Sequence, residues 1–160
     1  MITPGQTLNL DFRVKAVGPQ GAGGVREVAF RELLSRRTIV SAHMKNNTPS
    51  CDRQVASLVE HAGEFAAAGY DIVAVSRDTS GSHLRYAAAK QVPFTLVSDP
   101  KDLWARAADS LVNKMMYGRE FIGPARAAWV IEPDGRVLAV MEQVDTSDHA
   151  AQVREVIKSL

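Results

Sequence analysis

The sequence predicts an α/β protein with a mixed central sheet flanked by helices. Two observations support this: β-branched apolar stretches alternate with segments of helical apolar spacing, and a tight turn joins the last two extended stretches. Strands that alternate with helices pair in parallel, whereas a tight turn joins antiparallel strands. The order strand, helix, strand, helix, strand, hairpin and helix therefore gives a mixed sheet, and we expect residues 1–160 to form one domain.

The N-terminal part predicts one strand and a flexible loop. Residues 8–14 alternate roughly between apolar and polar side chains, so we expect an edge strand that the chain enters through a Pro4-Gly5 turn. The loop GPQGAGG follows at residues 18–24. It does not complete a GxGxxG dinucleotide-binding motif, because Arg26 stands at the third glycine position.

A buried strand and a long helix are expected next. Residues 38–44, TIVSAHM, are apolar and β-branched, and the polar loop KNNTPS follows them. Asn47 or Thr48 can cap the helix, and Pro49 suits its first turn. Gly69 is expected to end it. The apolar residues at helical spacing are Val55, Leu58, Val59, Ala62, Phe65 and Ala66.

Two further strands follow, with a second helix between them. The strands are expected at residues 71–78 and 94–99, and a short helical piece comes after them at residues 103–108. One of three side chains can cap the second helix: Asp78, Thr79 or Ser80.

The C-terminal part predicts a hairpin and an amphipathic helix. Residues 127–132 and 136–144 flank the turn EPDG, where proline presets one backbone angle and glycine tolerates a positive one. The final helix carries its apolar residues on one face, which we expect to pack on the sheet. These residues are Ala150, Val153, Val156, Ile157 and Leu160.

Composition argues against several classes of protein. Of the 160 residues, 46% are hydrophobic and 23% are charged, as in a globular domain. A nucleic-acid-binding protein usually has a basic excess, whereas 19 basic residues are balanced by 18 acidic ones here. The chain shows neither a secretion signal nor an apolar run of about 18 residues, so we expect no membrane association.

The chain has one cysteine, Cys51, so it forms no intramolecular disulfide, and we expect a cytoplasmic protein. Cys51 lies three residues after Thr48, in the first turn of the predicted helix. The free amides and partial positive charge of a helix N-terminus lower a cysteine pKa and favour the reactive thiolate. A lone cysteine is often only a small buried hydrophobe, but the polar neighbours of Cys51 predict an accessible, reactive thiol.

Five segments resemble peroxiredoxins, in the same order along the chain. NNTPSC at residues 46–51 is similar to the peroxidatic loop, especially in the bacterioferritin comigratory protein subfamily, which usually reads TPGC. The other segments are PGQTLNLDF at 4–12, DIVAVSRDTSGSH at 71–83, VPFTLVSDP at 92–100 and MYGREFIGPARAAWVIEPDG at 116–135. The resemblance spans nearly the whole chain, and it implies the thioredoxin fold with an N-terminal β extension.

The resemblance also implies a thiol peroxidase that reduces hydrogen peroxide and organic hydroperoxides without a cofactor. It puts the peroxidatic cysteine at Cys51, the hydroxyl that hydrogen-bonds peroxide at Thr48, and the thiolate-stabilising arginine at Arg126. These residue types suit the reaction, because donors fixed near both peroxide oxygens stabilise the charge that develops on them. The surrounding pocket would contain His43, Met44, Pro49, Ser50 and Gln54.

Three positions depart from the family's usual pattern. Met44 stands where relatives usually have a proline that shields the thiolate, and Gln54 stands where the subfamily often has glutamate. Ala56 stands where many relatives have a resolving cysteine, so the two-cysteine mechanism is excluded. We expect a one-cysteine mechanism, in a monomer or homodimer, with an external reductant. That reductant would be a small thiol or a thioredoxin-like or glutaredoxin-like protein.

Several other side chains have a structural interpretation beside a functional one. His43 can bond near Cys51 or act as a local base, although a hydrogen-bonded core histidine is the simpler interpretation. His61, His83 and His149 are expected at the surface or at helix caps. Four apolar residues are expected in the core or in a collar beside the pocket: Met115, Met116, Tyr117 and Phe121.

Three alternative functions compete with the peroxidase for this sequence. A thioredoxin-like redox protein without peroxidase activity shares the fold, but Thr48 stands at the place of the first cysteine of its CxxC pair. A zinc site is disfavoured because no CxxC or HxxxH spacing accompanies Cys51. A degenerate peroxiredoxin that acts as a binding or chaperone module stays open, because Met44 and Gln54 depart from the usual pattern.

Overall fold

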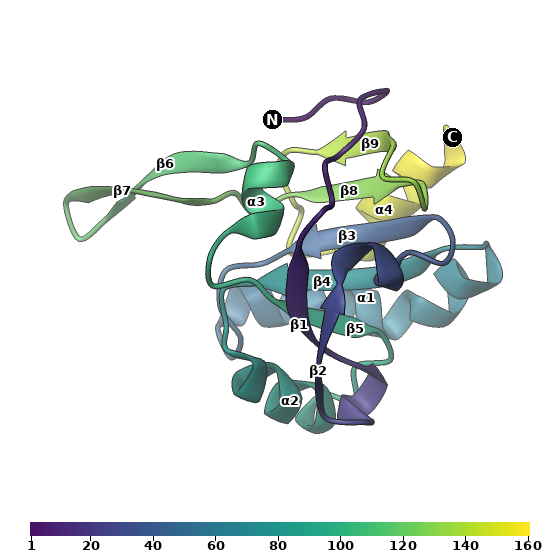
Figure 1. Ribbon diagram of the computed structural model, residues 1–160, viewed down its shortest axis with the longest axis horizontal. Coiled ribbons are helices and arrows are strands. Elements are labelled where there is room, and N and C mark those ends of the chain that lie inside the picture. The colour runs from purple at the N-terminus through teal and green to yellow at the C-terminus, as the bar shows by residue number, and fades with distance from the viewer.

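A seven-stranded mixed sheet runs through the centre of the computed structural model, which describes residues 1–160 (Figure 1). Its strands are β1 (Arg13–Val17), β2 (Val25–Ala29), β3 (Thr38–Ala42), β4 (Asp71–Ser76), β5 (Thr95–Ser98), β8 (Ala128–Ile131) and β9 (Val137–Met141). They lie in the order β2-β1-β5-β4-β3-β8-β9. The pairs β3–β4 and β4–β5 are parallel and the other pairs antiparallel, which confirms the predicted mixed sheet.

Four α-helices and two short 3-10 helices connect the strands. They are α1 (Pro49–Ala67), α2 (Ser80–Ala89), α3 (Leu103–Ala107), α4 (His149–Lys158), η1 (Pro19–Gly21) and η2 (Phe30–Leu33). As predicted, α1 begins after Thr48 with Pro49 in its first turn, and the chain leaves it through Gly69 at a φ of 95°. Thr79 caps α2, because its hydroxyl accepts a hydrogen bond from the amide of Ser82 at 3.1 Å.

Both faces of the sheet are covered, as Figure 1 shows. A cluster of 18 buried apolar residues packs α1, α2 and α4 on one face and includes Leu58 and Val153. A second cluster of 19 buries the opposite face beneath α3 and the N-terminal segment, where the rings of Trp104 and Trp129 lie 5.2 Å apart. Strand β3 is therefore buried along its whole length, and the loop that follows it begins on rigid structure.

The predicted strand at residues 8–14 is wrong. Sheet pairing begins only at Arg13, and before it Thr7 makes a single bridge to Arg136. Leu8 and Leu10 are 1% and 0% exposed, so the apolar alternation reflects burial rather than strand pairing. The unpredicted strand β2 also covers β1, which therefore lies inside the sheet and not at its edge.

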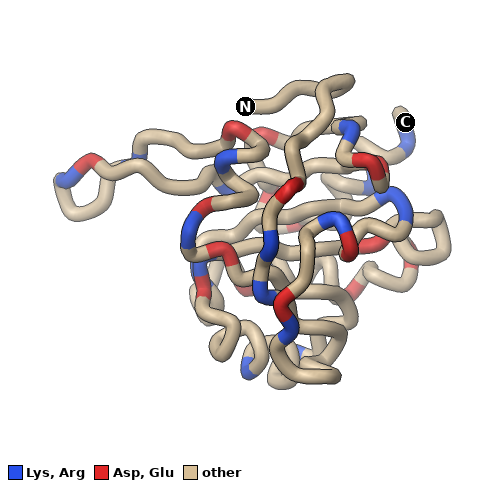
Figure 2. The backbone as a smooth tube through the Cα atoms, in the orientation of Figure 1, with Lys and Arg blue, Asp and Glu red and all other residues tan.

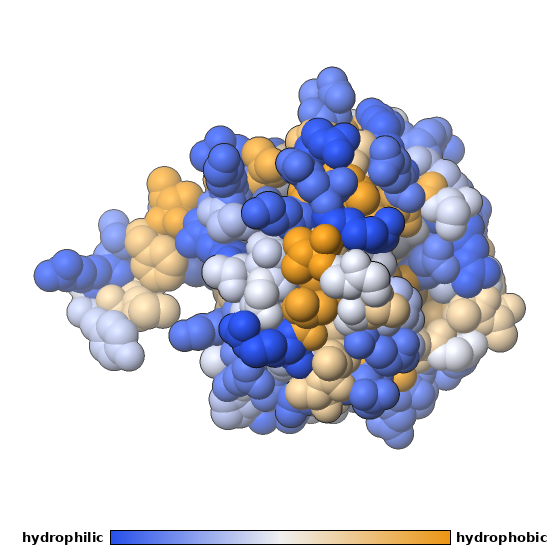
Figure 3. Space-filling model, turned by 60° about the horizontal axis from the view of Figure 1, so that its bottom comes forward, coloured by the Kyte–Doolittle hydropathy of each residue, from blue (hydrophilic) through white to orange (hydrophobic).

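A second hairpin, which the sequence did not predict, projects from the body of the protein (Figure 1). Strands β6 (Leu111–Met116) and β7 (Arg119–Pro124) pair only with each other. Met115 is 68% exposed and Tyr117 is 97% exposed, so these side chains do not join the core, and Figure 3 shows apolar surface on the projecting arm. Of the two predicted placements, the core is therefore wrong for Met115 and Tyr117, because the hairpin has no partner to bury it, whereas the collar stays a prediction.

Charged residues are spread over the visible backbone. Figure 2 shows basic and acidic positions interspersed, without a stripe of one sign, in agreement with the net charge of +1. No helix combines the length and the apolar character that crossing a membrane requires.

Candidate active site

Cys51 lies just beyond the end of β3, as the third residue of α1. It is only 1% exposed, so the prediction of an accessible thiol is wrong for this conformation. The polar sequence around it does reach solvent, because Lys45, Asn47 and Arg53 are exposed. Lys45 and Asn47 lie in the loop before α1 and Arg53 lies on the helix, whereas Cys51 turns inward, so residues close in sequence differ in burial.

The sulfur of Cys51 accepts hydrogen bonds from the backbone amides of Met44 and Lys45, each at 3.4 Å from Sγ. Burial raises the pKa of the Cys51 thiol. The Thr48 hydroxyl, the two amides and the positive charge of Arg126 lower it, and the net result is a pKa below the ordinary value. The predicted tendency toward thiolate is therefore present in the structure.

Thr48 is both the N-cap of α1 and a neighbour of the thiol. Its hydroxyl donates to the carbonyl oxygen of Lys45 at 2.6 Å. A hydroxyl has one proton, so a hydrogen bond from Thr48 to the sulfur or to a bound peroxide must replace the bond to Lys45. The residue is half-buried.

Arg126 reaches the first turns of α1 from the connection between β7 and β8. Its Nη1 donates to Gln54 Oε1 at 2.8 Å, and its Nη2 donates to Ser50 Oγ at 3.1 Å. These two acceptors flank Cys51 in sequence, and both are neutral. No carboxylate is paired with Arg126, so its charge acts on the Cys51 sulfur.

Gln54 and Met44, the two unusual pocket residues, have different surroundings. Gln54 is 0% exposed, and its Nε2 donates to Ser41 Oγ at 2.9 Å and to the Ala42 carbonyl oxygen at 3.0 Å. Met44 is half-buried, and its thioether accepts a hydrogen bond from the ammonium of Lys114 on β6. Lys114 is a neighbour of the site that sequence reasoning missed, because it approaches only when the hairpin folds.

The lysine carries an altered pKa in these surroundings. Burial lowers the pKa of Lys114, and the positive charges of Arg77 and Arg126 lower it further, while Cys51 opposes this shift. Cys51 therefore has a second cation near it besides Arg126.

His43 supports the loop rather than the sulfur. Its ring is 2% exposed, and its Nε2 lies 2.8 Å from Asn46 Oδ1. Burial lowers the pKa of His43, which keeps the ring neutral. The backbone amide of Asn46 donates to Asp78 Oδ2 at 3.0 Å. The hydrogen-bonded core histidine is therefore the interpretation that the structure favours.

The placement of His83 and His149 at the surface or at caps is wrong, since both are 0% exposed. Their ring nitrogens have partners inside the protein: His83 Nδ1 lies 3.0 Å from Asn46 Nδ2, and His149 Nε2 lies 3.0 Å from Ser41 Oγ. Polar partners on the strands and loops make that burial tolerable. His61 is half-buried on α1.

The remaining predicted positions have simpler roles. Pro49 is exposed and serves as the first residue of α1, while Ala56 is exposed one turn beyond the thiol. No group of three or more histidine, cysteine, aspartate or glutamate side chains is arranged to hold a metal ion.

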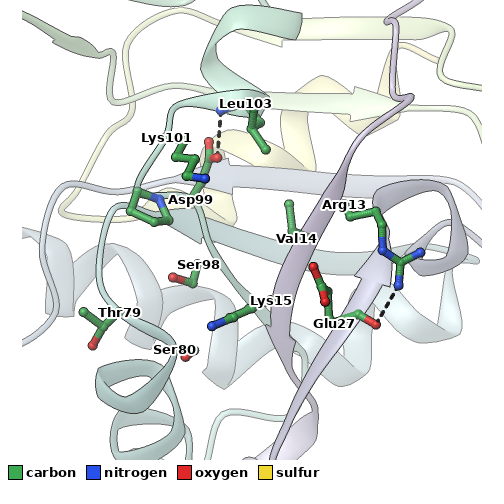
Figure 4. Close-up of a pocket in the computed structure, with 11 residues that line it drawn as sticks. Arg13, Val14, Lys15, Glu27, Thr79, Ser80, Ser98, Asp99, Lys101 and Leu103 are labelled. Carbon is green, nitrogen blue, oxygen red and sulfur yellow. Dashed lines mark hydrogen bonds between the residues drawn. The ribbon is translucent and has the colours of Figure 1, made fainter.

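A hollow of about 370 Å³ lies away from this site, between β1, β2 and the start of α2 (Figure 4). Two of its charged side chains hydrogen-bond to the backbone: Arg13 donates to the Glu27 carbonyl oxygen at 3.2 Å, and Asp99 accepts from the Leu103 amide at 2.8 Å. The hollow contains no residue of the Cys51 site.

Comparison with known proteins identifies the family of this chain. The model of the AhpC/TSA family matches residues 8–140. Peroxiredoxin Bcp of Xanthomonas campestris is 29% identical over 141 residues, which are 88% of each chain. Peroxiredoxin Bcp of Bacillus subtilis is 27% identical over 133 residues, which cover 83% of this chain and 85% of the relative.

Solved structures show the same fold. Peroxiredoxin Q of Xanthomonas campestris has a TM-score of 0.82 and 28% identity, and the match covers 99% of this chain and 96% of that one. A second structure, of the Xanthomonas campestris bacterioferritin comigratory protein described for its alkyl peroxide reduction activity, matches with a TM-score of 0.82, 27% identity and the same coverage. The predicted thioredoxin fold of peroxiredoxins is thereby confirmed, and the chain belongs to the AhpC/TSA family, as a one-cysteine relative of the Bcp peroxiredoxins.

Proposed function

We propose that this protein is a one-cysteine peroxiredoxin that reduces hydrogen peroxide and organic hydroperoxides at Cys51 and is regenerated by an external thiol. The observation that carries the proposal is the environment of the sulfur. Two backbone amides donate to Sγ at 3.4 Å, and the unpaired charge of Arg126 lowers the pKa of the thiol. Both features favour the thiolate, which is the nucleophilic form of cysteine.

In the first step the Cys51 thiolate attacks one oxygen of the hydroperoxide. A sulfur–oxygen bond forms, the oxygen–oxygen bond breaks, and the leaving oxygen takes a proton and departs as water or an alcohol. Negative charge moves from the sulfur toward the leaving oxygen, so donors beside the sulfur serve the transition state. Arg126, which Gln54 and Ser50 hold at the start of α1, supplies a positive charge, and Thr48 supplies a hydroxyl that can turn from Lys45 to the peroxide.

The second step removes the sulfenic acid that the first step leaves on Cys51. No second cysteine exists in the chain, and the exposed residue one turn further along α1 is Ala56. An external thiol attacks the Cys51 sulfur, water leaves, and a mixed disulfide forms. A second thiol then releases Cys51 in its reduced form. The thiol comes from a small molecule, from a thioredoxin-like or glutaredoxin-like protein, or from Cys51 of another copy.

Peroxide consumption separates this enzyme from a degenerate peroxiredoxin that only binds. Reduced protein without any thiol should consume about one equivalent of hydrogen peroxide per chain, because each Cys51 reacts once. Added dithiothreitol should then allow continuous turnover. Cys51→Ser is the matched control and should show neither phase. Absence of the first phase in the wild-type protein would refute the proposal, and so would equal consumption by Cys51→Ser.

A further inference from the structure

We infer that His149, in the first turn of α4, is a positioning residue for Arg126 and acts on it through Ser41 and Gln54. The inference rests on the proposed function, since it assigns Arg126 to the thiolate. It concerns a chain of side chains that joins three separate elements, α4, β3 and α1, to the arginine. His149 touches neither Cys51 nor Arg126 directly.

The chain of hydrogen bonds is continuous. Arg126 Nη1 donates to Gln54 Oε1 at 2.8 Å, and Gln54 Nε2 donates to Ser41 Oγ at 2.9 Å. Ser41 Oγ lies 3.0 Å from His149 Nε2. His149 Nδ1 lies 3.0 Å from Gln152 Oε1, one turn further along α4. Four hydrogen bonds therefore separate the guanidinium from the far end of the network.

Backbone groups fix the direction of the network at the Gln152 end. The amide of Asp145 donates to Gln152 Oε1 at 3.0 Å, and Gln152 Nε2 donates to the Gln143 carbonyl oxygen at 2.6 Å. Oε1 therefore faces His149, and Nδ1 must carry the ring proton. In the neutral ring Nε2 is then an acceptor, and the Ser41 hydroxyl donates its hydrogen bond to it.

The Gln54 end of the network is fixed in the same way. Gln54 Nε2 also donates to the Ala42 carbonyl oxygen at 3.0 Å, so the amide nitrogen points toward β3. Oε1 is left to face Arg126 and serves as its acceptor. The Ser41 hydroxyl accepts one hydrogen bond from Gln54 and donates one to His149. Only one arrangement of protons satisfies every member of the network.

Burial makes this arrangement costly to break. Ser41 is 1% exposed, and Gln54 and His149 are both 0% exposed, so water cannot replace a lost partner. Burial lowers the pKa of His149, and the charge of Arg126 lowers it further. Gln152 and the carboxylate of Asp145 oppose that shift. The ring is thus held in the neutral form that the network requires.

Loss of the His149 acceptor frees the Ser41 hydroxyl, so on the β3 side the Gln54 amide is then held firmly by the Ala42 carbonyl oxygen alone. Arg126 keeps its charge, but the Gln54 oxygen that orients one of its N–H groups is held less firmly. The expected consequence is a misaimed arginine beside an otherwise intact helix. That effect differs from general loss of packing, because it acts on the thiolate.

The variant His149→Phe removes both ring nitrogens and keeps the size of the side chain. We expect kcat/KM for hydrogen peroxide to fall roughly tenfold, as for the loss of one ordinary hydrogen bond. The pKa of the Cys51 thiolate, followed by its absorbance, should rise. His149→Gln places an acceptor near the position of Nε2 and should restore most of the rate and the pKa. If His149→Phe does not fold, Ser41→Ala breaks the same chain from β3 and should give the same two changes.

Two comparisons show whether His149 acts through Arg126. In an Arg126→Ala background, His149→Phe should cause no further loss of rate, because the group it positions is gone. Val153→Ala, a fully buried change on the same helix, should lower stability without moving the thiolate pKa. A Cys51 pKa equal to that of the wild-type protein in both His149→Phe and Ser41→Ala would overturn the inference. An undiminished loss of rate from His149→Phe in the Arg126→Ala background would overturn it as well. If the wild-type protein consumes no peroxide, the proposed function fails, while the thiolate titration still decides this inference.

Discussion

Two buried hydrogen-bond networks flank α1, one toward α4 and one toward α2, and they differ in charge. The network toward α4 joins Arg126, Gln54, Ser41 and His149 and contains a cation without a carboxylate. Its acceptors are amide and hydroxyl oxygens and one ring nitrogen. The guanidinium charge is therefore not neutralised within the network.

The network toward α2 is built around a carboxylate. Asp78 accepts from the backbone amide of Asn46 at 3.0 Å and from the hydroxyl of Ser76 at 2.5 Å. The side chain of Asn46 then bridges the rings of His43 and His83. All these contacts tie the loop after β3 to β4 and α2.

The difference indicates a division of roles. The Asp78 network holds the loop that carries the amides of Met44 and Lys45, so it serves mainly to maintain structure. The Arg126 network holds a charge next to the sulfur, so it serves mainly the thiolate. Changes on the arginine side should act on rate, and changes on the loop side should act on stability.

The largest expected effect comes from Arg126→Ala. Loss of a donor used in the transition state should slow peroxide reduction by about 10²- to 10³-fold. The unfolding free energy should fall by only about 1 kcal/mol, because one buried oxygen of Gln54 loses its partner. Arg154→Ala, at an exposed ion pair on α4, is the control and should leave the rate unchanged. A large loss of stability in Arg126→Ala with an unchanged rate per folded molecule would reverse the assignment.

On the loop side, the effect should appear as a loss of stability in acid. Burial and, after it, the neighbouring His43 lower the pKa of His83 from 6.5 to about 4. Between these two pH values the unfolded chain binds a proton at His83 that the folded protein does not bind. The unfolding free energy therefore decreases as pH falls through this window, by roughly 3 kcal/mol in total for this one residue.

Urea unfolding of wild type and His83→Gln from pH 7 to pH 4 measures this contribution. The variant should show a shallower dependence on pH, with the remainder coming from His43 and His149, whose pKa values are also lowered. Identical slopes in the two proteins would contradict the role given to His83.

A smaller effect is expected from Gln54→Glu. A carboxylate 2.8 Å from Arg126 would neutralise the arginine and could no longer donate to Ser41. The pKa of Cys51 should therefore rise, and peroxide reduction should slow by about tenfold or less. Thiolate titration and stopped-flow peroxide consumption measure the two quantities. A lower Cys51 pKa in the variant would mean that the uncompensated charge is not what stabilises the thiolate.

The smallest effect should come from the tip of the β6–β7 hairpin, outside both networks. Tyr117 is 97% exposed at its tip, so Tyr117→Ser should change the unfolding free energy by less than about 0.5 kcal/mol. The rate should not change. The comparison variant is Lys114→Met in the same hairpin, because it removes the hydrogen bond to Met44 that Tyr117→Ser leaves in place. A stability loss above about 1 kcal/mol in Tyr117→Ser would show that the hairpin tip is buried in solution.

Much of the sheet could be predicted because local patterns and sheet position agree. Strands β3 and β4 are continuous apolar stretches, and β8 and β9 flank a turn with proline and glycine. Residues 8–14 misled the prediction, because the side chains of Leu8 and Leu10 are buried without strand pairing. The β6–β7 hairpin was missed because its apolar residues face solvent, against the rule that links periodicity to burial.

The same distinction between local pattern and tertiary contact applies to the active-site residues. Cys51 and Thr48 could be placed from the strand, polar loop and helix around them, whereas Arg126 came only from the family resemblance, since it lies far away in sequence. His149 and Ser41 carry no local signal, because their contact joins α4 to β3 through tertiary packing. The burial of Cys51 was missed for a related reason: exposed polar residues lie close to it in the loop and on α1, and only the fold shows which way the sulfur turns.

The most direct test of the central claim is the intact mass of the reduced protein after one equivalent of hydrogen peroxide, with a sulfenic-acid trap such as dimedone present. We expect one trapped adduct per chain, located at Cys51, and its disappearance when a thiol is added before the trap. With excess peroxide and no thiol, the mass of a sulfinic acid should accumulate instead. An unmodified mass despite continued peroxide consumption would contradict the account, because the chemistry would then not proceed through Cys51.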